Sequence, residues 1–458
     1  MKKIIILGAG QVGTSVAESL ILEKNDVTVI DKDAVRLNAL QSRLDLRTVV
    51  GNAGHPSVLI DAGIEDCELL IAVTEVDEIN MMACKIAHGI FNVPTRIARI
   101  RSNEYLKDKR LSDVDMFSIN HVICPEQILT DYVLKLVQFP EALQVLEFAN
   151  GLVSLVAIRA HNEGLLVGSP ISDIHKHMPD IDARIVAIFR DNQSIRPDGN
   201  KVIRADDEIF FLSETRNMRQ VMEGLRKMDR PVNRVMIAGG SEISFRLAQI
   251  LEDKHKVKLL ESDHARSEFL SANLKSTLVL KGAENDMKLL AEENIEEIDL
   301  YVSATGNDEK NIIGSLIAKK MGARRVVTLI NESAYVPLLE DADIDIVIGL
   351  SDATIGSILS HVRRADVIRD HSLRRGAAEA LEIVIHGDKS TSACVGKRVD
   401  EINWPEGAML GAIVRKDKVL MAHHAEVLQD EDHIIVFVSN KNDISKIEKL
   451  IQVSGLYI

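Results

Sequence analysis

The stretch MKKIIILGAGQVGTSVAESLILEKNDVTVID, Met1 to Asp31, decides the fold of the N-terminal region of the chain. The apolar run Ile4–Leu7 leads into a glycine turn, Gly8–Gly13, and residues with helical periodicity follow. A second apolar run, Val27–Ile30, then ends in Asp31. Strand, glycine turn, helix, strand and acid, in this order, are the context in which a G-x-G-x-x-G pattern predicts a nucleotide-binding Rossmann unit.

Each residue type in the turn suits contact with a pyrophosphate. Gly8 allows a tight turn out of the strand, Gly10 lets a pyrophosphate approach the backbone, and Gly13 lets the helix pack closely on the sheet. The helix directs its free N–H groups at the phosphates, so no cationic side chain is required. The predicted contacts in this segment are Gly8, Ala9, Gly10, Gln11, Val12 and Gly13. The alternative is a Rossmann unit that keeps its turn glycines and binds nothing.

Asp31 predicts which nucleotide fits. A carboxylate at the end of the second strand accepts hydrogen bonds from both ribose hydroxyls and repels a 2′-phosphate. We therefore expect NAD(H) rather than NADP(H). The same carboxylate does not separate NAD from ATP or ADP, because the ribose of these nucleotides is the same.

The composition indicates a cytosolic protein of several domains. The 458 residues are too many for one core, and 55 basic against 69 acidic residues give a net charge of −14. An acidic chain with few aromatic residues is a poor candidate for nucleic-acid binding. The four cysteines form no C-x-x-C pair, which indicates a reducing compartment without disulfides or a zinc site. We expect neither a signal peptide nor a membrane span, so that any membrane association goes through a partner.

Helical and apolar strand segments continue to alternate as far as about residue 100, which predicts a parallel sheet. Ligands bind beyond the carboxyl ends of such strands. The candidates there to hold adenine, ribose and phosphates are Asn52, Ala53, Thr74, Glu75 and Arg99. For Arg99 the alternative is a solvated arginine at the sheet edge, beside Arg96 and Arg101.

The second half of the chain repeats the first. A helix is predicted over Glu126–Val137, and short strands separated by turns follow, as in a small α+β domain. Arg234–Gly240 then repeats the first strand and turn, and Gly282 lies 231 residues after Gly51 (282 − 51). The sequence therefore predicts an α/β fold, in which two Rossmann-like parallel-sheet domains are each followed by a small α+β domain. The expected segments are 1–124, a linker helix within 125–141, 142–228, 232–353 and 372–455.

The second Rossmann-like unit offers a weaker nucleotide site. Its candidate contacts, by repeat position, are Gly239, Gly240, Ser241 and Glu261. Ser241 and Ser244 replace the second and third glycines, so side chains stand where a pyrophosphate would approach and where the helix would pack. Ile330 stands at the counterpart of Arg99. Two alternatives stay open for this unit, a second nucleotide site and a structural copy.

Both halves resemble the RCK or KTN domains, the family that regulates the conductance of potassium. The resemblance runs from end to end, and its most specific stretches are Ile6–Gly13, Ala98–Ser102, His361–Asp366 and Ser372–Ala380. It implies a cytosolic homotetramer whose eight nucleotide-binding lobes form a ring under a membrane-embedded potassium transporter of the TrkH type. It also implies that NAD(H) and ATP or ADP are regulatory ligands, which bind at the residues named above and gate the transporter.

Two other functions compete with a regulatory one. An NAD-dependent oxidoreductase needs a proton donor or acceptor beside the nicotinamide, and nothing in the sequence places a histidine there. Its substrate domain would also be single, whereas the small domain is duplicated. A transcriptional regulator needs a basic face, and the basic residues that cluster are only Arg363, Arg364, Arg369, Arg374 and Arg375. This cluster is either a solvated linker or a contact to a partner or neighbouring subunit. We therefore expect a binding protein and not an enzyme.

Overall fold

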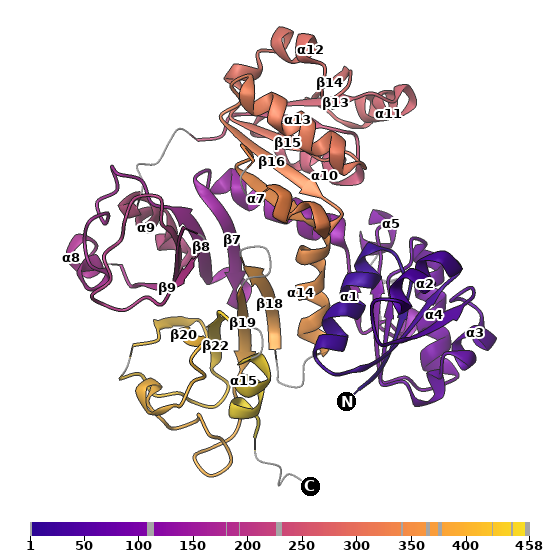
Figure 1. The fold of residues 1–458 in the computed structure, drawn as a ribbon, viewed down its shortest axis with the longest axis horizontal. Helices are drawn as coiled ribbons and strands as arrows, with labels where there is room; N and C mark the ends of the chain where they lie inside the picture. Colours follow the sequence, from indigo (N-terminus) through magenta and orange to yellow (C-terminus); the bar gives the residue numbers. More distant parts are fainter. Residues whose placement is uncertain are drawn as a thin grey trace. The chain divides into compact units, whose positions relative to one another are not determined.

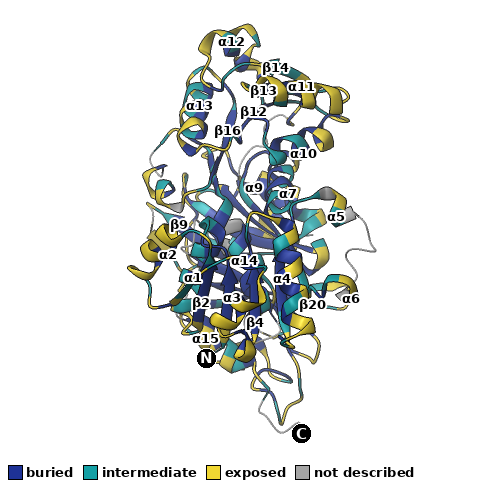
Figure 2. Ribbon diagram, turned by 90° about the vertical axis from the view of Figure 1, so that its right-hand side faces the viewer, coloured by how far each residue is buried: buried dark blue, intermediate teal, exposed yellow. Residues whose placement is uncertain are grey.

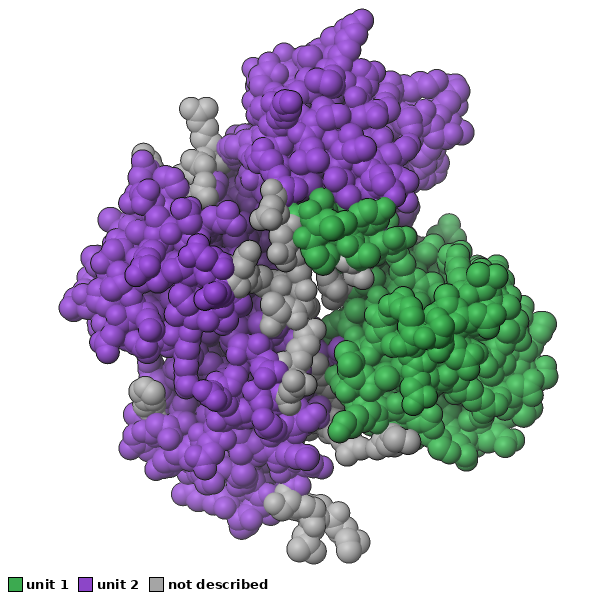
Figure 3. Space-filling model, viewed as in Figure 1, with its two compact units in different colours: residues 1–129, 329–340, 348–358 green, residues 130–328, 341–347, 359–458 purple. Residues whose placement is uncertain are grey.

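The structure is a computed structural model, and it describes residues 2–107, 114–179, 181–191, 193–225, 231–339, 342–362, 367–373, 378–423, 425–440 and 443–453 (Figure 1). By its internal contacts the chain divides into two compact parts (Figure 3). One part comprises residues 1–129, 329–340 and 348–358, and the other comprises residues 130–328, 341–347 and 359–458, so neither part coincides with one of the two Rossmann-like units.

The first sheet has six parallel strands in the order β3-β2-β1-β4-β5-β6. Its elements are β1 (Lys3–Leu7), α1 (Gln11–Leu22), β2 (Asp26–Asp31), α2 (Ala34–Gln41), β3 (Arg47–Val50), α3 (Pro56–Asp61), β4 (Leu69–Ala72), α4 (Asp77–Gly89), β5 (Thr95–Arg99), α5 (Asn103–Lys107), α6 (Val114–Phe117) and β6 (His121–Ile123). The central strands are apolar throughout because helices cover both faces of a parallel sheet. The strand order reverses between β1 and β4, which creates a crevice at their carboxyl ends.

A second six-stranded sheet repeats this order as β14-β13-β12-β15-β16-β17. Its elements are β12 (Arg234–Ala238), α10 (Glu242–Leu251), β13 (Lys256–Glu261), α11 (His264–Asn273), β14 (Leu278–Lys281), α12 (Met287–Glu292), β15 (Leu300–Ser303), α13 (Asp308–Lys320), β16 (Arg325–Ile330) and β17 (Ile346–Gly349), followed by α14 (Leu350–Val362). The central strands of both sheets are buried, whereas the edge strands β3 and β14 and the outer faces of α2, α3, α11 and α12 are largely exposed or half-buried (Figure 2). The predicted pair of Rossmann-like sheets is confirmed.

Each small domain is a five-stranded antiparallel sheet, and the two sheets have matching strand orders, β10-β9-β11-β8-β7 and β21-β20-β22-β19-β18. The first follows α7 (Pro125–Gln138) and contains β7 (Ala142–Phe148), β8 (Val153–Arg159), α8 (Ile174–His177), β9 (Ala183–Arg190), β10 (Gln193–Ile195), β11 (Glu208–Glu214) and α9 (Met218–Leu225). The second contains β18 (Val367–Leu373), β19 (Ala378–Val384), β20 (Ala408–Arg415), β21 (Lys418–Met421), β22 (His433–Val438) and α15 (Ile444–Ile451). The predicted tandem duplication is therefore confirmed.

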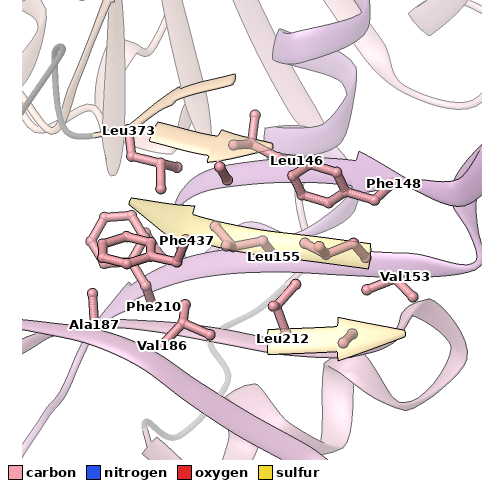
Figure 4. Packing of buried hydrophobic residues seen from close by; sticks show 14 of the residues in the cluster. Leu146, Phe148, Val153, Leu155, Val186, Ala187, Phe210, Leu212, Leu373 and Phe437 are labelled. Atoms are coloured by element: carbon pink, nitrogen blue, oxygen red, sulfur yellow. The ribbon is translucent and has the colours of Figure 1, made fainter. Parts of the chain in front are cut away.

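The two small sheets share one apolar core (Figure 4). Phe210 and Leu212 of β11 belong to the same buried cluster as Leu373 of β18 and Phe437 of β22. Gly411 of β20 lies so close to the sheet of the first small domain that a Cβ there would be 2.2 Å from Leu212 Cδ1 of β11. The small domains thus pack on each other, face to face.

A buried ion pair recurs in each small domain. Arg190 donates to both oxygens of Asp207 at 2.7 and 2.8 Å, and Arg415 donates to both oxygens of Asp432 at 2.8 Å, 225 residues later (415 − 190). Hydrogen bonding to the carboxylate raises the pKa of both arginines. A bidentate pair of this kind satisfies a carboxylate that the fold removes from water.

The structure adds two features that the sequence pattern did not indicate. A sixth strand, β6, lies at the edge of the first sheet, and β18 begins at Val367, before residue 372. Of the predicted basic cluster, Arg363, Arg364, Arg374 and Arg375 lie outside the described residues. Arg369 lies in β18, with its Nε 3.8 Å from the buried carboxylate of Glu382.

Candidate functional site

The predicted nucleotide-binding residues of the first Rossmann-like unit all lie at one edge of the first parallel sheet. The glycine turn follows β1, Asp31 ends β2, and Arg99 ends β5. Asn52 and Ala53 follow β3, while Thr74 and Glu75 follow β4. Because parallel strands end at the same edge, the structure brings these residues together around the crevice between β1 and β4.

The three turn glycines meet different surroundings. Gly8 has φ +106°, and a Cβ there would lie 3.1 Å from the Val73 carbonyl oxygen, beside β4. A Cβ on Gly13 would lie 1.9 Å from the Gly8 carbonyl oxygen, so the helix and the turn touch through backbone. A Cβ on Gly10 would have no atom within 4 Å. The turn is therefore tightly packed at Gly8 and Gly13 and open at Gly10.

The N-terminus of α1 is uncapped among the described residues. Gly10 is the N-cap residue, no side chain accepts from the first N–H groups, and the first turn holds no acidic residue. The first N–H groups of a helix have no partner within the helix, and the helix dipole adds partial positive charge there. This end of α1 is thus suited to an anion such as a phosphate.

Asp31 is held in place by the turn that it faces. Its Oδ2 accepts the Ala9 N–H at 2.6 Å, and its Oδ1 accepts the Asp33 N–H at 2.9 Å. An ionised carboxylate has about four acceptor positions, so each oxygen keeps room for one further donor. The half-buried carboxylate can therefore accept two hydroxyl groups without losing the backbone contacts that orient it.

The loop that follows β3 is held by a hydrogen bond between two of its own residues. The exposed side chain of Asn52 accepts the Gly54 N–H through Oδ1 at 2.9 Å. Ala53 is buried at 5% exposure, and Glu75, beyond β4, is exposed. Ala53 therefore belongs to the floor of the loop, whereas Asn52 and Glu75 present polar groups to solvent.

Asn80 is a positioning residue that the sequence analysis did not select. Its Oδ1 accepts the Thr74 N–H at 3.0 Å and the Thr74 hydroxyl at 2.7 Å, while its Nδ2 donates to the carbonyls of Thr74 and Arg99 at 3.1 and 2.9 Å. The buried amide thus ties the end of β4 to the end of β5. The signal was present in the repeat, because Asn311 binds Thr305 in the same way in the second unit.

Asp77, at the start of α4, has a related positioning role. Its Oδ2 accepts the N–H groups of Arg101 and Ser102 at 2.9 and 2.8 Å. It therefore fixes the backbone that follows Arg99, and it too recurs in the second unit, as Asp308.

Arg99 is not a solvated arginine, since only 7% of it is exposed. Its Nη2 lies 3.1 Å from Glu126 Oε1, at the first turn of α7, and Arg101 Nε lies 3.4 Å from the same oxygen. Burial lowers the pKa of the Arg99 guanidinium, and the nearby Glu126 carboxylate opposes this. Two arginines thus share the Glu126 carboxylate at this end of the sheet.

The second unit reproduces the turn and its acid. Gly239 has φ +94°, the Gly240 N–H donates to Glu261 Oε2 at 2.6 Å, and the Asp263 N–H donates to Glu261 Oε1 at 2.6 Å. Ser241 differs from Gly10, because its hydroxyl caps α10 by accepting the Ser244 N–H at 3.3 Å. Ile330 is buried, without a charge, where the first unit has Arg99.

Other kinds of site are not evident in the residues that the structure describes. No helix there is both long enough and apolar enough to cross a membrane. No group of three or more His, Cys, Asp or Glu residues is arranged to hold a metal ion. His423 pairs with Asp182 on the surface at 3.0 Å.

Comparison with known proteins gives matches over the full chain. The TrkA-N domain family matches residues 4–125 and 235–350, and the TrkA-C domain family matches residues 155–225 and 388–452. The chain is 49% identical to the Trk system potassium uptake protein TrkA of Halomonas elongata, over 98% of this chain and 99% of that protein. It is 47% identical to the protein of the same name from Vibrio alginolyticus, over the whole of both.

Solved structures show the same fold at low sequence identity. The GsuK RCK domain superposes with a TM-score of 0.62 at 15% identity, covering 98% of this chain and 95% of that chain. The GsuK channel bound to NAD gives the same TM-score and identity, covering 98% of this chain and 79% of that chain.

Proposed function

Because this chain belongs to the TrkA family of Trk-system potassium uptake proteins, we propose that it binds an adenine nucleotide at its first glycine turn and thereby regulates a potassium transporter. Membership of this family confirms the resemblance predicted from the sequence. The family is regulatory and not enzymatic, so the oxidoreductase alternative is set aside.

The nucleotide proposal rests on the position of three features at one edge of the first parallel sheet. The uncapped N-terminus of α1, the open space at Gly10 and the oriented carboxylate of Asp31 lie together at the reversal point of a parallel sheet. These features suit a diphosphate and a ribose at the spacing of the Rossmann pattern. NAD(H), ATP and ADP all contain this group, and one structural relative is described as bound to NAD and another as bound to ADP.

Named residues supply each element of the site. The N–H groups of Gly10 to Gly13 face the diphosphate, and Asp31 accepts the ribose hydroxyls. Asn52, Ala53, Thr74 and Glu75 surround the nucleoside, and Arg99 adds positive charge from β5. Because Glu126 already pairs with Arg99, a bound phosphate competes for that arginine and changes the contacts at the start of α7. A ligand that favours one arrangement of Glu126 shifts the protein toward it.

The partner in this proposal is a membrane-embedded potassium transporter of the TrkH type. The name of the family identifies a component of a potassium uptake system.

We propose that the chain forms a homotetramer on the cytoplasmic face of the membrane and reaches the membrane through that partner. Light scattering that gives a mass near four chains supports this assembly, and a stable monomer contradicts it.

Ligand choice tests the site directly. NADH, ADP and ATP should raise the melting temperature of the full chain, whereas NADPH at equal concentration should not, because its 2′-phosphate meets Asp31. Asp31→Ser should admit NADPH. The matched change in the second unit, Glu261→Ser, should leave the discrimination unchanged. Equal stabilisation of the wild-type protein by NADPH would overturn the role of Asp31.

A further inference from the structure

Side chains of the second unit cover its own glycine turn. Arg266 of α11 donates through Nε to the Gly240 carbonyl at 2.6 Å. A Cβ built on Gly240 would lie 2.5 Å from Glu261 Oε2, 2.8 Å from Leu270 Cδ1 and 3.1 Å from Arg266 Cγ. Gly240 stands at the position of the buried Ala9, so the feature that sets the second turn apart is the Arg266 side chain bound to the Gly240 carbonyl.

Aromatic rings hold Arg266 in this position. The guanidinium carbon lies 4.8 Å from the ring centre of Phe269 and 5.9 Å from that of Phe245, and the two ring centres are 5.6 Å apart. A cation over aromatic faces is attracted to them, so both rings favour the arginine that lies across the turn.

The N-terminus of α10 is occupied by the protein's own groups. The Ser241 hydroxyl accepts the Ser244 N–H, and Glu242 places a carboxylate in the first turn. That carboxylate lies 3.2 Å from Arg246 Nε and 3.8 Å from Arg266 Nη2. Negative charge is stabilised at a helix N-terminus, and here Glu242 supplies it in place of a ligand.

The first unit carries the same arginine without the residues that hold it. Arg36 stands 230 positions before Arg266 (266 − 36), with a side chain that is 53% exposed and pairs with Asp33. Ala39 occupies the position of Phe269. At the offset of 231 (242 − 11), Gln11 and Thr14 occupy the positions of Glu242 and Phe245. The two units therefore share the arginine and differ at the three positions whose side chains hold it in the second unit, Glu242, Phe245 and Phe269.

We propose that Arg266 and Glu242 close the second glycine turn against nucleotide phosphates, so that each chain binds one nucleotide, at the first unit. This inference rests on the function proposed above. The Glu242 carboxylate, paired with Arg246 and Arg266, takes the place of a phosphate at the helix N-terminus, and Arg266 occupies the approach to the turn. The serines are secondary, because Ser244 is fully buried and its hydroxyl lies 3.4 Å from the Ala304 carbonyl oxygen, so the packing of α10 already accommodates it.

Calorimetric titration of the full chain with ADP tests the closure. The wild-type protein should bind one ADP per chain. The double variant Glu242→Gln with Arg266→Ala should show a second class of sites, raising the stoichiometry toward two. The matched first-unit variant Arg36→Ala should stay at one, and so should Ser241→Gly with Ser244→Gly, which leaves Arg266 and Glu242 in place.

Variants built on Gly10→Ser distinguish ADP binding at the first unit from ADP binding at the second. Gly10→Ser should abolish ADP binding, and adding Glu242→Gln with Arg266→Ala to it should restore one ADP per chain. Two ADP per wild-type chain, or one in the double variant with a folded melting profile, would overturn the closure. A wild-type protein that binds no ADP, NADH or ATP would instead overturn the proposed function.

Discussion

Gly10 and Gly13 belong to one turn but are glycine for different physical reasons. Gly13 leaves no space for a Cβ, which would lie 1.9 Å from a carbonyl oxygen of the backbone. Gly10 has free space on the side where a Cβ would stand, and that space is where we place the diphosphate. Gly13 is therefore required by packing, whereas we propose that Gly10 is required by the ligand.

We expect opposite phenotypes from two alanine substitutions. Gly13→Ala should lower stability by about 1–3 kcal/mol through overpacking, although alanine normally favours a helix. Gly10→Ala should leave the melting temperature unchanged without ligand and weaken ADP binding at least tenfold, about 1.4 kcal/mol. Melting curves and calorimetry on both variants measure this. Unchanged ADP affinity in Gly10→Ala would place the diphosphate elsewhere.

We expect His371 of β18 to make the stability of the second small domain depend on pH. Burial lowers the pKa of the His371 imidazole to about 4 from 6.5, and the charge of Arg369 lowers it further. The ring packs edge-on against Phe148, with centroids 5.2 Å apart. Since the unfolded chain takes up the proton first, stability is fully present above about pH 6.5 and is lost as the pH falls toward 4.

The loss from this group should be on the order of 2 kcal/mol across that window. His371→Gln, which cannot titrate, should flatten the fall in melting temperature between pH 7 and pH 5. His161→Gln, at an exposed position, is the control and should retain the wild-type slope. Identical slopes for all three proteins would show that His371 contributes nothing to acid sensitivity.

Some site residues were predictable from the sequence and others were not. The turn and Asp31 follow from a local pattern in which each residue type has a fixed task. Asn80 and Glu126 act through contacts with residues 19 and 27 positions away in the chain, and no periodicity reports such contacts. The closure by Arg266 was hidden for the same reason, since the sequence shows the serines but not which side chains lie over the turn.

At the scale of elements, periodic segments were predicted well and two of the edge strands were not. The helix expected over Glu126–Val137 is α7, Pro125–Gln138. Strand β6 has three residues, too few to show an alternation, and β18 carries charged residues within its span. Both lie at sheet edges, where one side lacks a neighbouring strand and the sequence is less constrained.

The contact between the two small sheets depends on Gly411. Gly411→Val should lower stability by about 1–3 kcal/mol, because its side chain overlaps Leu212 and Val186 in a core without free space. Shortening the opposing residue, Leu212→Ala, should cost less in the Gly411→Val background than in the wild type. A double-mutant cycle by thermal or urea unfolding measures this coupling. Strictly additive effects would mean that the two residues do not meet.

At the scale of the whole chain, the duplication was the most predictable property. Matching residues recur at closely similar offsets within the Rossmann-like units and within the small domains, and the strand orders of the paired sheets agree. What the repeat did not predict is the difference between its copies. Divergence at a few positions leaves the fold intact and changes the chemistry of one turn, because the fold depends on many apolar contacts and a site on few polar ones.

Potassium or rubidium flux tests the central claim, that nucleotide at the first glycine turn regulates transport. A TrkH-type membrane subunit would be reconstituted in liposomes with the wild-type protein or with Gly10→Ser, and flux followed as NADH, ADP or ATP is added. We predict that nucleotide changes the flux with the wild-type protein, and that Gly10→Ser binds the transporter but removes the response. An equal response to nucleotide with Gly10→Ser would contradict the account.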